Sequence, residues 1–315
     1  MKILATLIFI LTAGIGIVKS QNSPIGVKDI LPLMKKKQEH AASGEIVFFS
    51  KQTEISETIA SELEKECIDM MENLSFSGKS EKLHASLEKV ADLLKSSGIE
   101  FETSLSTLRY AGNKFYWRRE LPVNEKNKVF LDKTKENIKE FVVEQSYIDG
   151  LHSYLDPFSN TLNVEERADQ YGLSGESLLA LDLTFVNYTN LLTEIPERKI
   201  SLYKTDTGFS IKTQITENGF EKQNYVVRDN FPYIKNIEAL MGENGTSVKK
   251  YFAGYVPMDG GKKKETIYRP SLVAEITRLK NGEIFLKLFE VKKWDLKKFE
   301  TNDFVIKPNP KTKIK

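Results

Sequence analysis

Asp149, His152 and Asp156 are the residues of this chain whose types and spacing come nearest to a metal site. Carboxylate and imidazole groups are ligands that zinc accepts. Asp149 precedes Gly150, however, and an Asp-Gly pair is a turn signal. In an extended segment, residues 149 and 152 also point to opposite faces, because side chains alternate along a strand. We therefore interpret the group as turn chemistry and expect neither a metal site nor a cofactor.

The sequence also lacks the motifs of common catalytic and nucleotide-binding classes. It has no Walker-type glycine loop, no His-Glu-x-x-His pair and no Gly-x-Ser-x-Gly nucleophile elbow. Residues 172–175 come closest to the elbow, but Ser174 or Ser177 fits better as the N-cap of an expected helix. The glutamates of residues 54–66 lie on the outer faces of another expected helix, which is typical of a solvated surface rather than a glycosidase pair. We predict no catalytic residues and no enzyme activity, with an exported hydrolase as the most distant alternative.

Composition and charge exclude further classes of protein and of binding site. The 315 residues are 40% hydrophobic, enough for a core, and the net charge of +2 gives no footprint for a nucleic-acid binder. The single Cys67 excludes an internal disulfide framework and a cysteine-rich zinc site, and we expect it to be buried and inert.

The charge is unevenly distributed along the chain. From residue 247 to the end there are 17 Lys and Arg and 8 Asp and Glu, a local net charge of +9. We interpret these cations as solvent-facing lysines of edge strands, with docking onto anionic lipid or an acidic partner as the alternative.

The first twenty residues have the pattern of a secretory signal. Lys2 supplies a positive charge, Ile3–Val18 is almost wholly apolar or small, and Ser20 provides a small residue at the exit. The apolar run is short for a membrane span of about 20 residues. We predict cleavage near Ser20/Gln21, a periplasmic or secreted location, and no transmembrane span in the mature chain. An uncleaved anchor is the alternative.

The next part of the chain, residues 21–98, is expected to be a helical segment. Residues 26–42 predict a short helix. An apolar stripe at helical spacing then predicts a longer one, formed by Ile55, Ile59, Leu63, Cys67, Met70 and Leu74. Ser80 suits the N-cap of the following helix and Gly98 suits its end. Residues 54–97 therefore predict an antiparallel helical hairpin.

From residue 99 the pattern changes to strands and turns. Alternation over 99–105 predicts a half-buried strand, and Gly112-Asn113 predicts a turn before a strand over 115–121. A hairpin is expected over 141–154, a loop over 123–137 and a helix over 164–192. The further strands that we expect are 199–205, 209–216, 222–228, 251–256, 266–269, 271–279 and 283–292. Consecutive hairpins of this kind predict an antiparallel sheet over residues 99–310, followed by a tail over 311–315.

Aromatic residues are concentrated around the first of these hairpins. They are Phe115, Tyr116, Trp117, Tyr147, Tyr154 and Phe158. On a curved antiparallel sheet, alternate members of this set line one concave face. They fit ordinary core packing beneath a covering helix, or the wall of an apolar cavity for acyl chains, which needs shape and hydrophobicity rather than catalytic groups.

A family resemblance rests on the same region. It is carried by Gly112-Asn113-Lys114-Phe115-Tyr116-Trp117, Leu121-Pro122, Tyr147-Ile148-Asp149-Gly150-Leu151, Tyr154 and Asp156-Pro157, with Asp303-Phe304-Val305-Ile306-Lys307-Pro308 near the C-terminus. In this order the elements resemble the periplasmic lipoprotein carriers of the LolA/LolB-like superfamily. The resemblance implies an open half-barrel of antiparallel strands, covered by helices, that holds lipoprotein acyl chains on its concave face. The family's strand arginine does not align, because Ala111 occupies its place and Arg109 lies two residues earlier.

The sequence thus predicts an α+β protein with a curved antiparallel β-sheet, an open half-barrel with covering helices, preceded by an N-terminal helical hairpin. We predict non-catalytic binding of a hydrophobic ligand, such as a lipid or a lipoprotein acyl chain. Phe115, Trp117 and Tyr154 are the expected hydrophobic wall, and Arg109 is a possible polar latch. The alternative is an envelope interaction protein with a solid core, which docks onto a protein partner through its helical hairpin or its basic C-terminal strands.

Overall fold

The computed structural model describes residues 25–73, 76, 80–99, 101–112, 114–122, 140–157, 159–166, 200–242, 245–258 and 265–315. The expected signal segment 1–20 and the expected loop 123–137 lie outside the described residues. So does the expected helix 164–192 beyond residue 166, and residues 164–166 themselves belong to a strand instead.

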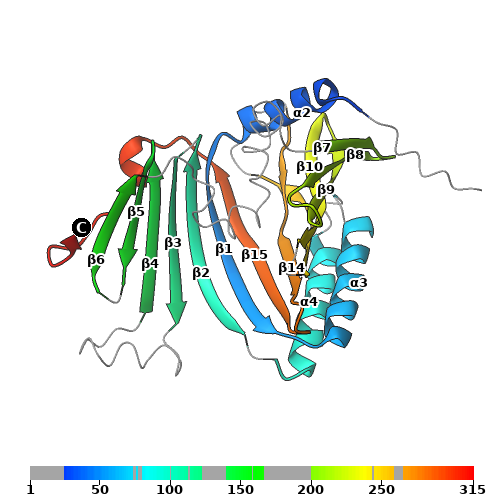
Figure 1. Cartoon of the computed structure of the whole chain (residues 1–315), viewed down its shortest axis with the longest axis horizontal. Helices are drawn as coiled ribbons and strands as arrows, with labels where there is room; N and C mark the ends of the chain where they lie inside the picture. Colours follow the sequence, from blue (N-terminus) through cyan, green and yellow to red (C-terminus); the bar gives the residue numbers. More distant parts are fainter. Residues whose placement is uncertain are drawn as a thin grey trace, which may run out of the picture.

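Within the described residues, one open sheet of fourteen strands dominates the fold (Figure 1), in the order β16-β6-β5-β4-β3-β2-β1-β15-β14-β11-β10-β9-β8-β7. The strands are β1 (Ser43–Glu54), β2 (Glu102–Ala111), β3 (Lys114–Pro122), β4 (Glu140–Ile148), β5 (Leu151–Asp156), β6 (Thr161–Glu166), β7 (Ile200–Lys204), β8 (Gly208–Gln214), β9 (Phe220–Arg228), β10 (Phe231–Met241), β11 (Thr246–Ala253), β14 (Leu272–Arg278), β15 (Ile284–Leu296) and β16 (Lys313–Ile314). Neighbouring strands are antiparallel except β16, which runs parallel to β6. The curved, unclosed antiparallel sheet that the sequence predicted is therefore confirmed.

Strand β1 is the main difference from the expected organisation. Residues 21–98 were expected to be helical, but β1 lies at the centre of the sheet, between β2 and β15. Its side chains alternate, and Ile46 and Phe48 are buried on one face. The first part of the chain is thus built into the sheet rather than preceding it.

Three helices of the described chain pack on the sheet. Helix α2 (Val27–His40) contacts β10, and α3 (Glu57–Asn73) contacts β11 and β15. Helix α4 (Ser80–Ser96) lies beside α3, as the predicted hairpin requires (Figure 1). A two-stranded sheet, β12 (Val256–Pro257) with β13 (Tyr268–Arg269), completes the described strands.

The two faces of the sheet carry separate hydrophobic clusters. We call the face that packs against α3 and α4 the outer face; Leu272 and Leu288 lie in its cluster. We call the opposite face, which packs against α2 and contains Phe48 and Phe289, the inner face. Cys67 is buried in the outer cluster, as predicted, and burial raises the pKa of its thiol to about 12. A thiol with such a pKa stays protonated at neutral pH and is a poor nucleophile.

Candidate functional site

A pocket of about 700 Å³ lies between α4 and the outer face of the sheet. This volume falls within the range of small-molecule sites, about 300–1,000 Å³. Its lining residues are Lys51, His84, Glu88, Val90, Ala91, Leu94, Lys95, Gly98, Ile99, Phe101, Leu272, Leu288, Glu290 and Lys292. The apolar members form the body of the pocket and the charged members come from its edges, which is the arrangement of a site for an amphiphile.

Helix α4 supplies one wall through its apolar stripe. Val90, Ala91 and Leu94 share one face of the helix because residues three and four apart are neighbours on a helix surface. Val90 and Leu94 are buried in the outer cluster, whereas Ala91 is exposed. Val90 and Leu94 therefore pack the helix onto the sheet, and the small side chain of Ala91 lies where the pocket is open to solvent.

The end of α4 shapes the next part of the wall. Gly98 adopts a left-handed conformation with φ +65°, its N–H donates to the carbonyl of Lys95 at 3.1 Å, and the N–H of Ile99 donates to the carbonyl of Leu94 at 3.4 Å. These two bonds define a Schellman motif, which usually brings the residue after the glycine against the last helical turn. Ile99 accordingly packs against the outer cluster, together with Phe101. The predicted helix stop at Gly98 is confirmed, and it is also what turns two apolar side chains into the pocket.

The sheet supplies the floor. Leu272 on β14 and Leu288 on β15 are both buried on the outer face. In the strand register, Leu272 lies opposite Glu290, and Leu288 lies opposite Lys51 of β1. Each apolar floor residue therefore has a charged residue as its direct neighbour on the adjoining strand.

The charged edge is organised around Glu290. Its Oε1 accepts a hydrogen bond from Lys51 Nζ at 2.6 Å, and its Oε2 accepts one from Lys292 Nζ at 2.8 Å. Burial alone raises the pKa of Glu290, but the hydrogen bonds from Lys292 and Lys51 outweigh it, so the pKa lies below the ordinary carboxyl value. Glu290 is therefore ionised at neutral pH, between two ammonium groups.

The opposite edge of the pocket belongs to α4. His84 Nε2 lies 3.2 Å from Glu88 Oε1, one helical turn away, and Lys95 lies in the last turn of the helix. The lining thus contains three lysines and two glutamates. The charged groups of this lining can form ion pairs and hydrogen bonds with a ligand.

The expected wall residues lie together on the inner face, away from this pocket. Trp117 on β3 pairs with Gln145 on β4, which pairs with Tyr154 on β5, so one row across three strands contains both predicted aromatics. Phe115 is buried in the core and stacks on Tyr147, with ring centroids 6.1 Å apart. Phe115 therefore has a packing role, while Trp117 and Tyr154 are half-buried.

Polar atoms interrupt the apolar character of this inner-face row. Trp117 Nε1 and Gln145 Oε1 are buried and have no hydrogen-bond partner within the part of the chain that the structure describes. His152 Nε2, on the neighbouring row, is in the same condition. Burying such groups without partners costs free energy, so this row is less suited to an alkyl chain than the pocket beneath α4.

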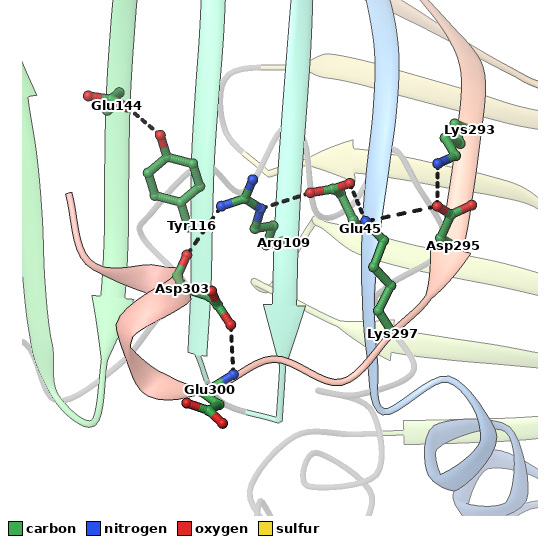
Figure 2. A network of polar contacts seen from close by, with 9 residues as sticks. All are labelled: Glu45, Arg109, Tyr116, Glu144, Lys293, Asp295, Lys297, Glu300 and Asp303. Carbon is green, nitrogen blue, oxygen red and sulfur yellow. Dashed lines mark hydrogen bonds and ion pairs between the residues drawn. The ribbon is translucent and has the colours of Figure 1, made fainter. Parts of the chain in front are cut away.

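Arg109, the expected latch, lies on the outer face and does not join the wall. Figure 2 shows its guanidinium between Glu45 and Asp303: Nε donates to Glu45 Oε2 at 2.8 Å, and Nη1 donates to the carbonyl of Asp303 at 3.5 Å. It also lies over the ring of Tyr116, 5.5 Å from the centroid. Arg109 therefore attaches the C-terminal segment to the sheet.

That C-terminal segment crosses the outer face of strands β3 to β6. It contains a short 3₁₀ helix, η1 (Thr301–Phe304), and ends in β16. Residues 303–308, which carry part of the family resemblance, do not form a strand: Phe304 ends η1, and only β16 of this segment pairs with the sheet. Phe304 and Ile306 are buried in a third cluster with Tyr116 and Leu162.

Beside this segment lies a polar pocket of about 400 Å³. Its lining residues are Arg109, Tyr116, Arg118, Glu144, Asn302, Asp303, Val305 and Lys307. The Tyr116 hydroxyl donates to Glu144, and the Asp303 carboxylate accepts a hydrogen bond from the N–H of Glu300 (Figure 2). The Glu144 bond therefore links β4 to β3, and the Asp303 bond caps the start of η1 within the C-terminal segment.

The remaining chemistry-bearing residues have structural partners. Asp149 and Gly150 have φ values of +48° and +96°, which confirms the predicted turn, and Asp149 Oδ2 lies 3.3 Å from Lys114 Nζ. His152 Nδ1 lies 2.9 Å from Glu165 Oε1. Within the described residues, no three His, Cys, Asp or Glu side chains are grouped to hold a metal ion. In that same part of the chain, no helix is both long enough and apolar enough to cross a membrane.

Only part of the α4 pocket could be predicted from the sequence. The helix that begins at Ser80 and its stop at Gly98 were predicted, but Lys51 and Glu290 are brought beside this helix by strand pairings between distant segments. The face on which Arg109 lies, by contrast, could have been predicted from the sequence. Two residues connect β2 and β3, so Ala111 pairs with Lys114 and Arg109 pairs with Tyr116. Cross-strand partners share a face, which separates Arg109 from Phe115 and Trp117.

Comparison with solved structures finds a crystal structure of a LolA superfamily protein from Nitrosomonas europaea. The two chains are 9% identical, the TM-score is 0.41, and the match covers 90% of this chain and 98% of the other. No family model and no curated protein matches the sequence.

Proposed function

We propose that this protein is a non-catalytic binding protein for a hydrophobic ligand, whose alkyl chain occupies the pocket beneath α4. The observation that carries the proposal is the pocket itself: about 700 Å³ with a body formed by Val90, Leu94, Leu272 and Leu288. Alkyl binding needs shape and apolar surface rather than reactive groups. The sequence resemblance to lipoprotein carriers supports lipid or lipoprotein acyl chains as the ligand class.

The signal pattern of residues 1–20 supports an exported, periplasmic or secreted protein with cleavage near Ser20/Gln21. In such a compartment, lipids and acylated proteins must be shielded from water during transfer, because each buried CH₂ group is worth about 0.8 kcal/mol. A carrier with an open pocket provides that shielding without chemistry.

Docking onto an envelope protein is less well supported, because the hairpin and the basic strands engage each other. Arg278 of β14 donates to Glu57 at 2.9 and 2.8 Å and to Glu64 at 2.6 Å, and Lys249 of β11 donates to Glu64 at 3.1 Å. Lys250 pairs with Glu275 at 2.7 Å. Part of the basic excess of the C-terminal strands is therefore neutralised by acidic residues of α3 and of the sheet.

Filling the pocket by substitution tests the proposal. Ala91 lines the pocket and is exposed, so Ala91→Trp places an indole in the alkyl site without removing core packing. We expect uptake of a fluorescent long-chain fatty acid to fall about tenfold or more. Ala85 is exposed on the same helix but does not line the pocket, so Ala85→Trp is the matched control and is expected to bind as the native protein does.

The same assay locates the site. Trp117→Glu introduces a charge into the inner-face row and is expected to leave uptake unchanged. Loss of uptake in Trp117→Glu with normal uptake in Ala91→Trp would place the ligand on the inner face. A native protein that takes up no fatty acid and co-purifies with no lipid would end the carrier proposal.

A further inference from the structure

We infer that the ligand of the α4 pocket is a single-chain amphiphile with an anionic head, bound at the Lys51–Glu290–Lys292 trio. This inference rests on the proposed function and specifies the ligand class for the same pocket. It is carried by the charges and hydrogen bonds at the pocket edge rather than by the apolar body.

The trio has an unbalanced positive charge. Glu290 contributes one carboxylate, and each of its oxygens already accepts a hydrogen bond from a different lysine. Each ammonium has three donors, so Lys51 and Lys292 can each donate further bonds, whereas the accepting oxygens of Glu290 are engaged. An added anion completes an alternating arrangement of two ammonium groups and two carboxylates.

The trio lies beside the two leucines that form the floor of the pocket. Lys51 lies opposite floor residue Leu288, and Glu290 lies opposite floor residue Leu272. Lys292 is two residues beyond Glu290, at the bulge where β15 shifts register against β1, and its Nζ lies 2.8 Å from Glu290 Oε2. An alkyl chain lying on the two leucines therefore has its head group within reach of both ammonium groups.

The surroundings strengthen attraction to a negative head. Glu290 is only 29% exposed and Lys51 32% exposed in their side chains, so their interactions are screened less than those of a fully solvated pair. On the α4 side of the lining, Lys95 adds a third ammonium group and Glu88 a second carboxylate, so the three lysines and two glutamates of the lining leave one net positive charge. With a neutral head group, the remaining N–H donors of the lysines bond to water instead of an anion. A cationic head group is repelled by the ammonium groups.

Calorimetric titration with three ligands of equal chain length tests the head-group preference. The ligands are dodecanoate, dodecyl phosphate and dodecanol, each kept below its aggregation concentration. We expect dodecanoate to bind about tenfold or more tightly than dodecanol, since hydrogen bonds to charged groups are the strong ones. Dodecyl phosphate distinguishes a general anionic site, which binds both anions, from one shaped for a carboxylate alone.

A gain of affinity gives the sharpest test. Glu290→Gln removes the competing carboxylate and leaves Lys51 and Lys292 without their anionic partner, so we expect tighter dodecanoate binding and unchanged dodecanol binding. Lys51→Gln with Lys292→Gln is expected to abolish the preference, while the double arginine variant retains it. Lys89→Gln, exposed on α4 and outside the lining, is the control.

The outcomes separate the two proposals. Equal binding of dodecanoate and dodecanol, or weaker dodecanoate binding by Glu290→Gln, overturns the anionic-head inference and leaves the hydrophobic pocket standing. Failure of all three ligands to bind the native protein overturns the proposed function together with the inference.

Discussion

Gly98 shows how one residue controls both the end of a helix and the wall of a pocket. Its φ of +65° is a conformation that costs an L-residue roughly 1–2 kcal/mol. A Cβ at this position would meet no atom within 4 Å, so strain rather than collision determines the effect of a substitution. The Schellman motif at Gly98 places Ile99 against the outer cluster, which links the residue to the pocket.

We therefore expect Gly98→Ala to destabilise the protein by about 1–2 kcal/mol and to weaken fatty-acid uptake. Gly98→Asn should cost less, since asparagine adopts the left-handed conformation more readily. Urea unfolding of the three proteins measures the difference. Equal stability of the alanine variant and the native protein would show that the α4 terminus can end in another way.

Glu45 is a second residue whose environment has a measurable consequence. Burial alone raises the pKa of Glu45, but hydrogen bonds from Lys297 and Arg109 outweigh it, so the pKa in the folded protein lies below the ordinary value of 4.5 (Figure 2). A carboxyl group whose folded pKa is lowered stabilises the folded state above the unfolded pKa. That contribution is lost as the pH falls below 4.5 and through the folded pKa.

Glu45→Gln should consequently be less stable than the native protein at neutral pH, and the difference should disappear as the solution is acidified below 4.5. Thermal unfolding as a function of pH provides the measurement. Glu102, exposed on the neighbouring strand β2, supplies a Glu→Gln control. A stability difference that persists in acid would mean that Glu45 acts through packing rather than through its charge.

At the scale of elements, sequence patterns were informative where one face of an element is buried and the other is solvated. The stripe of α3 is of this kind. The helices α3 and α4 were predicted close to their observed bounds, whereas the strand predicted over 99–105 is observed as β2 at Glu102–Ala111. Strand β10 was missed because Phe231, Pro232, Tyr233 and Ile234 are all buried, so alternation is absent. A short apolar run covered on both faces has no period to detect.

Strand β1 was missed for a related reason. Its apolar run Ile46–Phe49 is short and stands between two helical patterns, and its alternation becomes evident only with its partners β2 and β15 in place. The pocket shares this limit, because its floor and its edge come from strands paired over long sequence distances. Local pattern thus predicted the α4 wall, and tertiary pairing determined the site.

The C-terminal segment is the element whose attachment can be tested separately. Phe304 has no exposed surface, and its cluster joins η1 to Tyr116 and Leu162. We expect Phe304→Ala to cost about 3–5 kcal/mol and to increase hydrogen exchange in β16 and β6 before the rest of the sheet. The neighbouring Val305 is 45% exposed, so Val305→Ala should change stability by no more than about 0.5 kcal/mol. Uniform faster exchange in all strands would contradict local attachment.

At the scale of the whole molecule, the sheet separates two candidate faces. The inner face holds the predicted aromatics Phe115, Trp117 and Tyr154, among which buried polar atoms have no partner in the described residues. The outer face carries the α4 pocket near one part of the sheet and the C-terminal segment at another. Because the sheet lies between the faces, a bound ligand contacts the side chains of one face or the other. The location of a bound ligand therefore shows which face is the binding site.

Photolabelling with a fatty acid that carries a diazirine on its alkyl chain, followed by mass spectrometry of the peptides, shows which face of the sheet binds the ligand. We expect labels on α4 and on the β14 and β15 peptides that contain Leu272 and Leu288, with competition by unlabelled dodecanoate. Labels concentrated on the peptides of Trp117 and Tyr154, with none on α4, would contradict this expectation.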